Sequence, residues 1–259
     1  MIKEVAKQKN SLYFEGMTSI RAIISSIDKN SSDRRILKIY YDKSKLSKIK
    51  KEIGYFKAVS EKYGFELVET DFGFLDEITL GNTHGGIVAL TSDRTFPLLP
   101  SNENLIKKEG FYALIDGIED PYNFGYAIRS LYACGCDGIV LGERNWYSAA
   151  GVVCRSSAGA SELISCFTGD FEKTVLCFKK LGYTVVCADE NTDNLLGLTA
   201  LNRPILLVVG GEKRGVSAKI LELCDIRVKI PYGREFKASL SAASATTMFA
   251  YDILRQSLE

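Results

Sequence analysis

Short continuous apolar runs recur along the chain and are separated by glycine, proline and polar turns. The clearest run is Ile205 to Val209, which lies between Pro204 and Gly210. Runs of this kind are typical of strands buried on both faces of a sheet. The strands predicted in this way are 36–41, 65–69, 87–90, 112–116, 138–141, 163–167, 184–188, 205–209 and 228–231.

Between these runs, apolar residues recur at the three- and four-residue spacing of amphipathic helices. In the segment 15–26, for example, this spacing places Ile20, Ile23 and Ile24 on one face. Ser239 stands where a helix N-cap belongs, before the last helix. Strands that alternate with helices predict an α/β fold with a parallel sheet covered on both faces. The predicted helices are 15–26, 45–63, 74–79, 123–133, 149–157, 171–181 and 240–254, with one more between the last two strands.

Residues 91–110 break the alternation of strands and helices. They contain Pro97 and Pro100, several polar residues and no periodicity, which is typical of a linker. We therefore expect a small α/β domain at residues 1–95, a linker at 96–109 and a larger α/β domain at 110–259.

The bulk composition narrows the class of protein. No apolar run approaches the length of a membrane span, and the first residues lack the apolar core of a signal peptide. The seven cysteines are an odd number without a CxxC pair, and no group of residues has the spacing of a metal site. We therefore expect a cytoplasmic protein without a membrane segment, a disulfide framework or a metal.

The net charge of +1 conceals an asymmetry between the two ends of the chain. Residues 1–62 carry 15 Lys/Arg against 7 Asp/Glu, whereas the remainder carries 18 against 25. This distribution indicates a polyanionic partner held by the N-terminal part. A solvated helix face is the alternative, since Lys43 to Lys51 is lysine-rich at helical spacing.

Glycines follow two of the predicted strands in the C-terminal half. Gly210, Gly211 and Gly215 follow the first, and Gly233 follows the second. Turns at the carboxyl ends of parallel strands are where α/β proteins hold ligands. The first turn has the glycine spacing of a P-loop but lacks its Lys-Ser/Thr, and the chain has no GxGxxG, so ATPase and dinucleotide-binding sites are excluded.

A second polar segment follows the strand at 112–116 and leads into the helix that holds Arg129. Asn123 is positioned to cap that helix, and Gly125 permits a close approach of backbone. An arginine among the apolar residues of such a helix indicates an anionic partner, because burial of an unpaired guanidinium is costly. A salt bridge to Asp116 or Glu119 is the alternative. His84 is the only histidine, which favours a structural or RNA-contacting turn residue over a catalytic one.

Three motifs, taken in order, resemble the signatures of the SpoU/TrmH-type RNA 2′-O-ribose methyltransferases. The resemblance covers residues 110–257. A further segment resembles an intermediate segment of the family sequence. Two N-terminal segments resemble, more weakly, the substrate-binding domain that many members of the family carry at the N-terminus. The three motifs are Asn123-x-Gly125-x-x-x-Arg129, Gly210-x-Glu212-x-x-Gly215 and Ile230-Pro231…Ser239-Leu240; the further segments are Arg155-x-Ser157-x-Gly159-Ala160, Glu15-Gly16 and Gly81 to Ala89.

This resemblance implies a SPOUT-superfamily fold, whose parallel sheet has a C-terminal deep trefoil knot, and a homodimer. It also implies a small L30e-like α/β domain at the N-terminus that grips RNA, which agrees with the basic charge there. The methyl donor would be S-adenosyl-L-methionine. The cofactor-binding residues would be Gly210, Gly211, Glu212, Gly215, Ile230, Gly233, Ser239 and Leu240.

The resemblance also assigns catalytic roles. Arg129 would stabilise the attacking ribose oxygen or hold the adjacent phosphate, since a guanidinium barely deprotonates near neutral pH. Asn123 would orient Arg129 or the ribose, Glu212 would fix Arg129 or the substrate, and Ser239 would contact the ribose or phosphate. Ser241 completes the catalytic set; the family normally has asparagine at this position, and the serine hydroxyl reaches less far.

The function expected from these residues is 2′-O-methylation of ribosomal or transfer RNA. The alternative is a non-enzymatic RNA-binding or ribosome-assembly factor that keeps the fold, which Ser241 favours slightly. Asn123, Arg129 and Glu212 together favour the enzyme, because a pure binding protein has no evident need of all three. A small-molecule α/β enzyme is a third reading, against which the basic N-terminal part counts.

Overall fold

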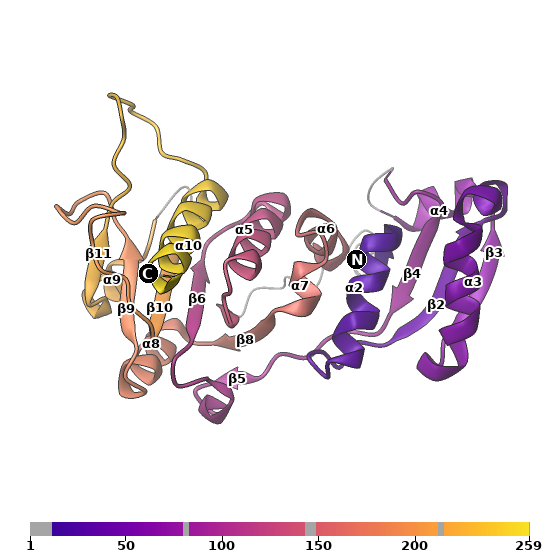
Figure 1. Cartoon of the computed structure of the whole chain (residues 1–259), viewed down its shortest axis with the longest axis horizontal. Helices are drawn as coiled ribbons and strands as arrows, with labels where there is room; N and C mark the ends of the chain where they lie inside the picture. The colour runs from indigo at the N-terminus through magenta and orange to yellow at the C-terminus, as the bar shows by residue number, and fades with distance from the viewer. Residues whose placement is uncertain (1–11, 80–82, 143–148, 212–214, 259) are drawn as a thin grey trace, which may run out of the picture. The chain divides into compact units, whose positions relative to one another are not determined.

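The computed structural model describes residues 12–79, 83–142, 149–211 and 215–258 (Figure 1). Its internal contacts divide these residues into two compact units. The first unit comprises the described residues up to Thr95 together with residues 149–163, and the second comprises residues 96–142 and 164–258.

The first unit is built on a four-stranded sheet of order β1-β4-β2-β3. Strand β4 is antiparallel to both of its neighbours, and β2 and β3 are parallel. Its core consists of buried residues such as Phe14, Ile20 and Phe56. The elements are β1 (Tyr13–Glu15), α2 (Gly16–Asp28), β2 (Ile36–Asp42), η1 (Lys43–Lys45), α3 (Leu46–Tyr63), β3 (Glu66–Thr70), α4 (Phe72–Ile78), β4 (Ile87–Thr91), α6 (Ala150–Ser156) and α7 (Ala160–Leu163).

Helices α6 and α7 belong to the first unit, although the sequence analysis placed their residues in the second domain. A Cβ on Gly151 would lie only 2.4 Å from the carbonyl oxygen of Tyr13, so α6 packs directly on β1. In α7, Glu162 forms a buried ion pair with Arg34, whose Nε lies 2.9 Å from the carboxylate. These contacts join residues far apart in the chain, which local patterns do not reveal.

The second unit is built on a seven-stranded sheet of order β11-β9-β10-β6-β7-β8-β5, in which every neighbouring pair is parallel (Figure 1). The parallel sheet expected from the sequence is therefore present. Its elements are β5 (Leu98–Leu99), η2 (Glu103–Leu105), β6 (Phe111–Asp116), α5 (Pro121–Ala133), β7 (Gly138–Leu141), β8 (Ser165–Gly169), α8 (Phe171–Lys180), β9 (Thr184–Ala188), β10 (Ile205–Gly210), α9 (Ala218–Leu223), β11 (Ile226–Val228) and α10 (Ala242–Leu258).

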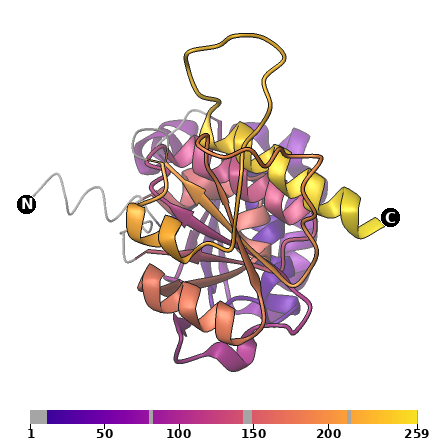
Figure 2. The same ribbon diagram turned by 90° about the vertical axis from the view of Figure 1, so that its left-hand side faces the viewer.

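A long loop connects β11 to α10 and projects from the second unit (Figure 2). The strand predicted at 228–231 thus ends at Val228, and residues 231–239 are exposed. The last helix begins at Ala242, two residues later than predicted, because Ser241 rather than Ser239 caps it. The Ser241 hydroxyl oxygen accepts a hydrogen bond from the Ser244 amide at 3.1 Å.

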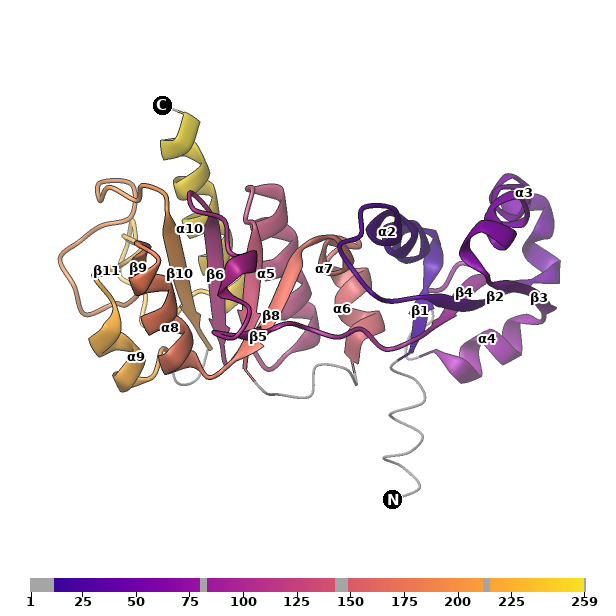
Figure 3. The same ribbon diagram turned by 90° about the horizontal axis from the view of Figure 1, so that it is seen from below.

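Helices cover both faces of the second sheet, with α5 and α10 on one face and α8 and α9 on the other (Figure 3). The core between them contains Tyr112, Phe167 and Phe178, packed against the buried residues of β9 and β10. No helix in the described part of the chain is long and apolar enough to span a membrane.

The predicted linker contains an edge strand. Leu98 and Leu99 pair in parallel with β8 at the end of the sheet, and the Leu99 side chain is 2% exposed. Pro97 and Pro100 flank this strand and suggested a linker, but proline is compatible with an edge strand because such a strand pairs on one side only. Residues 96–105 therefore form part of the second unit.

Candidate functional site

The loops that follow β6 and β10 touch each other at the carboxyl edge of the second sheet. These two strands are parallel neighbours, with Gly210 opposite Asp116. A Cβ on Gly211 would lie 2.3 Å from the carbonyl oxygen of Gly117, and Gly117 has a φ of +89°. The first two motifs of the sequence therefore meet in space, and glycine is required where their backbones touch.

The loop after β10 closes on itself. The Gly215 amide donates to the Gly211 carbonyl oxygen at 2.9 Å, and a Cβ on Gly210 would lie 2.2 Å from the carbonyl carbon of Gly215. Close packing of backbone on backbone thus explains the glycine spacing of this motif. Glu212, which the sequence analysis placed in both the catalytic and the cofactor-binding sets, lies outside the described residues.

Arg129 lies on the exposed face of α5, in line with Tyr122 and Tyr126. The expectation that Arg129 is buried was wrong, because the apolar residues of α5 face the sheet and Arg129 faces away from it. The alternative of a salt bridge to Asp116 or Glu119 is also wrong, since neither forms an ion pair with Arg129 among the residues that the structure describes. The guanidinium is therefore accessible to an anionic ligand.

The start of α5 differs from the prediction. Asp120 caps the helix, and its side chain accepts a hydrogen bond from the Tyr122 amide at 2.7 Å. Pro121 occupies the first turn, where its fixed φ favours a helix start and its missing N–H is not needed. Asn123 thus lies within the first turn instead of capping it. It is half-buried, and Gly125, two residues further on, is buried.

The third motif lies on the loop that leads into α10. Helix α10 packs beside α5, and the hydroxyl oxygens of Ser130 and Thr247 are 2.6 Å apart. Ile230 and Leu240 are half-buried, whereas Gly233 and Ser239 are exposed. In the described residues no hydrogen bond joins Ser239 to Arg129.

Four large side chains on α5 and α10 were not singled out by sequence reasoning. Tyr122 and Tyr126 are 55% and 49% exposed on α5, and Met248 and Tyr251 are 42% and 60% exposed on α10. The helical spacing of the sequence could have identified these four side chains, because they lie on the helix faces opposite the buried residues. Because Arg129 lies on the same face of α5, this apolar surface borders the candidate catalytic residue.

The remaining sequence candidates lie in the first unit. His84 is fully buried; its Nδ1 accepts a hydrogen bond from the Gly86 amide at 3.1 Å, and its Nε2 lies 3.1 Å from an Asp76 oxygen. It is therefore a structural turn residue. The Thr83 hydroxyl donates a hydrogen bond to the Glu15 carboxylate at 3.2 Å, so the two N-terminal segments that resemble the family's substrate-binding domain are in contact.

The segment Arg155-x-Ser157-x-Gly159-Ala160 lies at the connection between α6 and α7 and belongs to the first unit, whereas the other three motifs belong to the second. The Ser157 hydroxyl oxygen accepts a hydrogen bond from the Ser161 amide at 3.1 Å. A Cβ on Gly16 would lie 3.0 Å from Arg155 Nη1, so this segment adjoins the N-terminal segments that resemble the family's substrate-binding domain.

Comparison with known proteins identifies relatives of a large part of the chain. A protein of Staphylococcus haemolyticus assigned to the TrmH family of tRNA/rRNA methyltransferases is 30% identical over 152 residues, which are 58% of this chain and 61% of that protein. The 23S rRNA (guanosine-2′-O-)-methyltransferase RlmB of Shewanella oneidensis is 26% identical over 200 residues, which are 76% of this chain and 81% of that protein.

A solved structure shares the fold. The SpoU methyltransferase AviRb from Streptomyces viridochromogenes, in complex with AdoMet, aligns with a TM-score of 0.78 at 23% identity, over 98% of this chain and 97% of that chain. The model of the SpoU rRNA methylase family matches residues 110–251, which is more than half of the sequence and spans all three motifs. The chain therefore belongs to the SpoU rRNA methylase family.

Proposed function

We propose that this protein is an S-adenosyl-L-methionine-dependent methyltransferase that acts on a ribose 2′-hydroxyl of ribosomal or transfer RNA. The observation that carries this proposal is the family match over residues 110–251, together with the meeting of the first two motifs at one sheet edge. The name of the Shewanella oneidensis relative supports the 2′-O specificity.

The residues at this edge fit the proposed cofactor. Gly210 and Gly211 hold the two loops in close backbone contact at this edge, and the half-buried Ile230 and Leu240 offer apolar surface for an adenine ring. We place the cofactor between these residues, with Gly215, Gly233, Ser239 and Glu212 completing the set. When bound, S-adenosyl-L-methionine supplies a methyl group activated by a positively charged sulfur.

The protein side of the reaction rests on Arg129. A guanidinium stays protonated, so its role is to stabilise negative charge on the ribose oxygen as the hydroxyl proton leaves to water. Asn123, six residues before it on the same helix, orients the ribose, and Glu212 fixes the guanidinium. Ser239 contacts the ribose or its phosphate. Ser241 contributes mainly by capping α10, because its hydroxyl is engaged with the Ser244 amide.

We further propose a homodimer formed through the exposed face of α5 and α10. Tyr122, Tyr126, Met248 and Tyr251 would be covered by a second copy, which accounts for large apolar side chains in contact with solvent. Arg129 on the same face would then act close to the partner. The long loop before α10 would be threaded in a deep trefoil knot, and the first unit would be an L30e-like RNA-binding domain.

The proposed function is tested by incubating the purified protein with S-adenosyl-L-methionine carrying a labelled methyl group and with unmodified ribosomal or transfer RNA. We expect label in RNA, recovered after nuclease digestion as a 2′-O-methylnucleotide. Binding of S-adenosyl-L-methionine by calorimetry without any transfer to either RNA would refute the enzyme and leave a non-enzymatic RNA-binding factor.

A further inference from the structure

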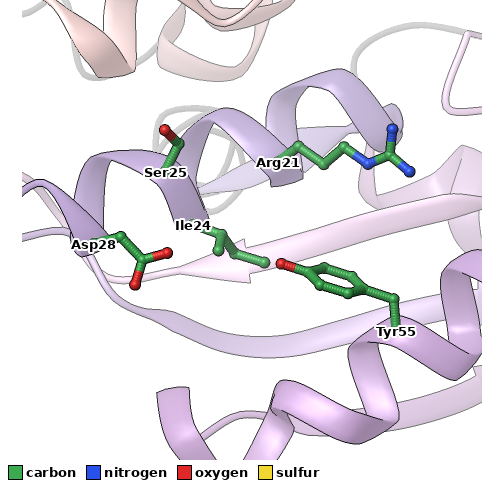
Figure 4. A pocket seen from close by; sticks show the side chains of 5 residues that line it. All are labelled: Arg21, Ile24, Ser25, Asp28 and Tyr55. Carbon is green, nitrogen blue, oxygen red and sulfur yellow. The ribbon is translucent and has the colours of Figure 1, made fainter.

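A pocket opens in the first unit between helices α2 and α3 (Figure 4). Its volume is about 360 Å³. Four of its lining residues, Arg21, Ile24, Ser25 and Asp28, recur at helical spacing along one face of α2. Tyr55 from α3 faces them, and its hydroxyl points toward Ile24.

The tyrosine is unusual in its exposure. Tyr55 is 44% exposed, although its neighbour Phe56 is completely buried in the core of the unit. The centroids of the two rings lie 5.4 Å apart, at an interplanar angle of 58°. A partly exposed aromatic ring therefore lines the pocket.

Positive charge lies close to this ring. Lys51 lies one turn before Tyr55 on α3 and is exposed. Arg21 on α2 is exposed, and within the described residues it forms no ion pair. Because the basic excess of the chain is concentrated in its first 62 residues, the pocket lies in the part of the protein that attracts polyanions.

The negative charge of Asp28, the single acidic residue that lines the pocket, is balanced by an ion pair with Lys62. Asp28 accepts a hydrogen bond from Lys62 Nζ at 2.9 Å and another from the Tyr63 hydroxyl at 2.8 Å. These bonds, the one from Lys62 foremost, lower the pKa of the Asp28 carboxyl. Its negative charge therefore opposes a polyanion less than a free carboxylate would.

We propose that the groove between α2 and α3 binds a single-stranded segment of RNA, with a base stacked on Tyr55 and a neighbouring phosphate held by Arg21. An open aromatic ring flanked by cations is the arrangement that binds single strands, because every base has a face that stacks and every linkage carries a negative charge. Ser25 and Asp28 line the same pocket, where their side chains offer hydrogen-bonding groups for the base. The proposal rests on the proposed function only in taking RNA as the substrate.

The test is equilibrium binding of the full-length protein to a short fluorescein-labelled oligouridine, followed by fluorescence anisotropy. Tyr55→Ala should raise the Kd about tenfold, since base stacking on an aromatic ring is lost, and Tyr55→Phe should bind like the wild type. The matched control is Leu37→Ala, because Leu37 is also 44% exposed in the first unit but lies outside the groove. Arg21→Ala should reduce the slope of log Kd against log salt by about 0.7.

Equal Kd values for Tyr55→Ala and Leu37→Ala, with both proteins folded by circular dichroism, would refute the proposal that the groove binds RNA. A wild-type protein that does not bind the oligouridine would also refute it. Labelled methyl transfer by the wild type separates this failure from failure of the proposed function. If Tyr55→Ala loses binding but the wild type transfers no methyl group, the proposed methyltransferase activity is refuted and the RNA-binding groove is supported.

Discussion

Replacing Glu162 with alanine tests whether α7 is held to the first unit by a buried charge pair. Arg34 and Glu162 have side chains only 3% and 4% exposed, and the Arg34 Nε lies 2.9 Å from the carboxylate. Arg34 also donates to the Ser92 carbonyl oxygen at 2.8 Å and to the Thr91 hydroxyl at 3.2 Å. Without Glu162, the guanidinium keeps these two acceptors but loses its counter-charge.

The magnitude follows from burial. Removing one partner of a buried ion pair leaves an uncompensated charge and costs about 3–5 kcal/mol, which is a large fraction of the free energy of unfolding of a typical protein. The matched control is Glu66→Ala. Glu66 forms an ion pair of 2.8 Å with Lys38, but these side chains are 61% and 43% exposed, so its loss should cost at most about 1 kcal/mol.

Urea denaturation followed by circular dichroism measures both variants. Glu162→Ala should lower the midpoint of the transition of the first unit much more than Glu66→Ala. The double variant Arg34→Met/Glu162→Leu should recover much of the loss, because it removes both charges and fills the space with apolar groups. Equal midpoints for Glu162→Ala and Glu66→Ala would refute the reasoning.

Three further predictions concern single residues. Ser241→Ala should lower the free energy of unfolding by about 1 kcal/mol through loss of the α10 cap, whereas Ser241→Asn should retain it; equal urea midpoints would contradict the cap. Gly211→Ala should weaken binding of S-adenosyl-L-methionine by calorimetry, because its Cβ would lie 2.3 Å from the Gly117 oxygen; Gly54→Ala, with open space at its Cβ, is the control, and equal affinity would exclude a role of the loop contact. Iodoacetamide should modify Cys224 first, because it is the one cysteine of the seven that is not buried and its pKa is lowered by a hydrogen bond from Cys187; earlier modification of any other cysteine, detected by mass spectrometry, would contradict this.

Hydrophobic runs predicted the strands of the second sheet well, because a strand buried on both faces has a pattern that depends on few neighbours. The strands at 138–141 and 184–188 are confirmed to the residue. Strands β1 and β5 were missed because they span three and two residues, which is too short for a periodic signal. The position of α6 and α7 depends on Arg34 and other residues distant in sequence, which no local pattern contains.

Helix starts show the same limit in the candidate site. Asn123 and Asp120 are both good capping residues, and Asp120 caps the helix because Pro121 is favoured in the first turn. Ser239 was the predicted cap of the last helix, but the hydroxyl of Ser241, two residues later, caps it, and Ala242 and Ala243, which follow it on the helix, are buried. The motif residues were recognisable from sequence, but the exposure of Arg129 became visible only in the folded chain.

The central claim is that Arg129 takes part in methyl transfer to RNA. It is tested most directly by the rate of labelled methyl transfer from S-adenosyl-L-methionine to RNA by the wild type, Arg129→Ala and Lys173→Ala, the last an exposed cation on α8 across the sheet. We predict that Arg129→Ala abolishes transfer while calorimetry shows that it still binds the cofactor, and that Lys173→Ala retains the wild-type rate. Transfer by Arg129→Ala at the wild-type rate would contradict the account.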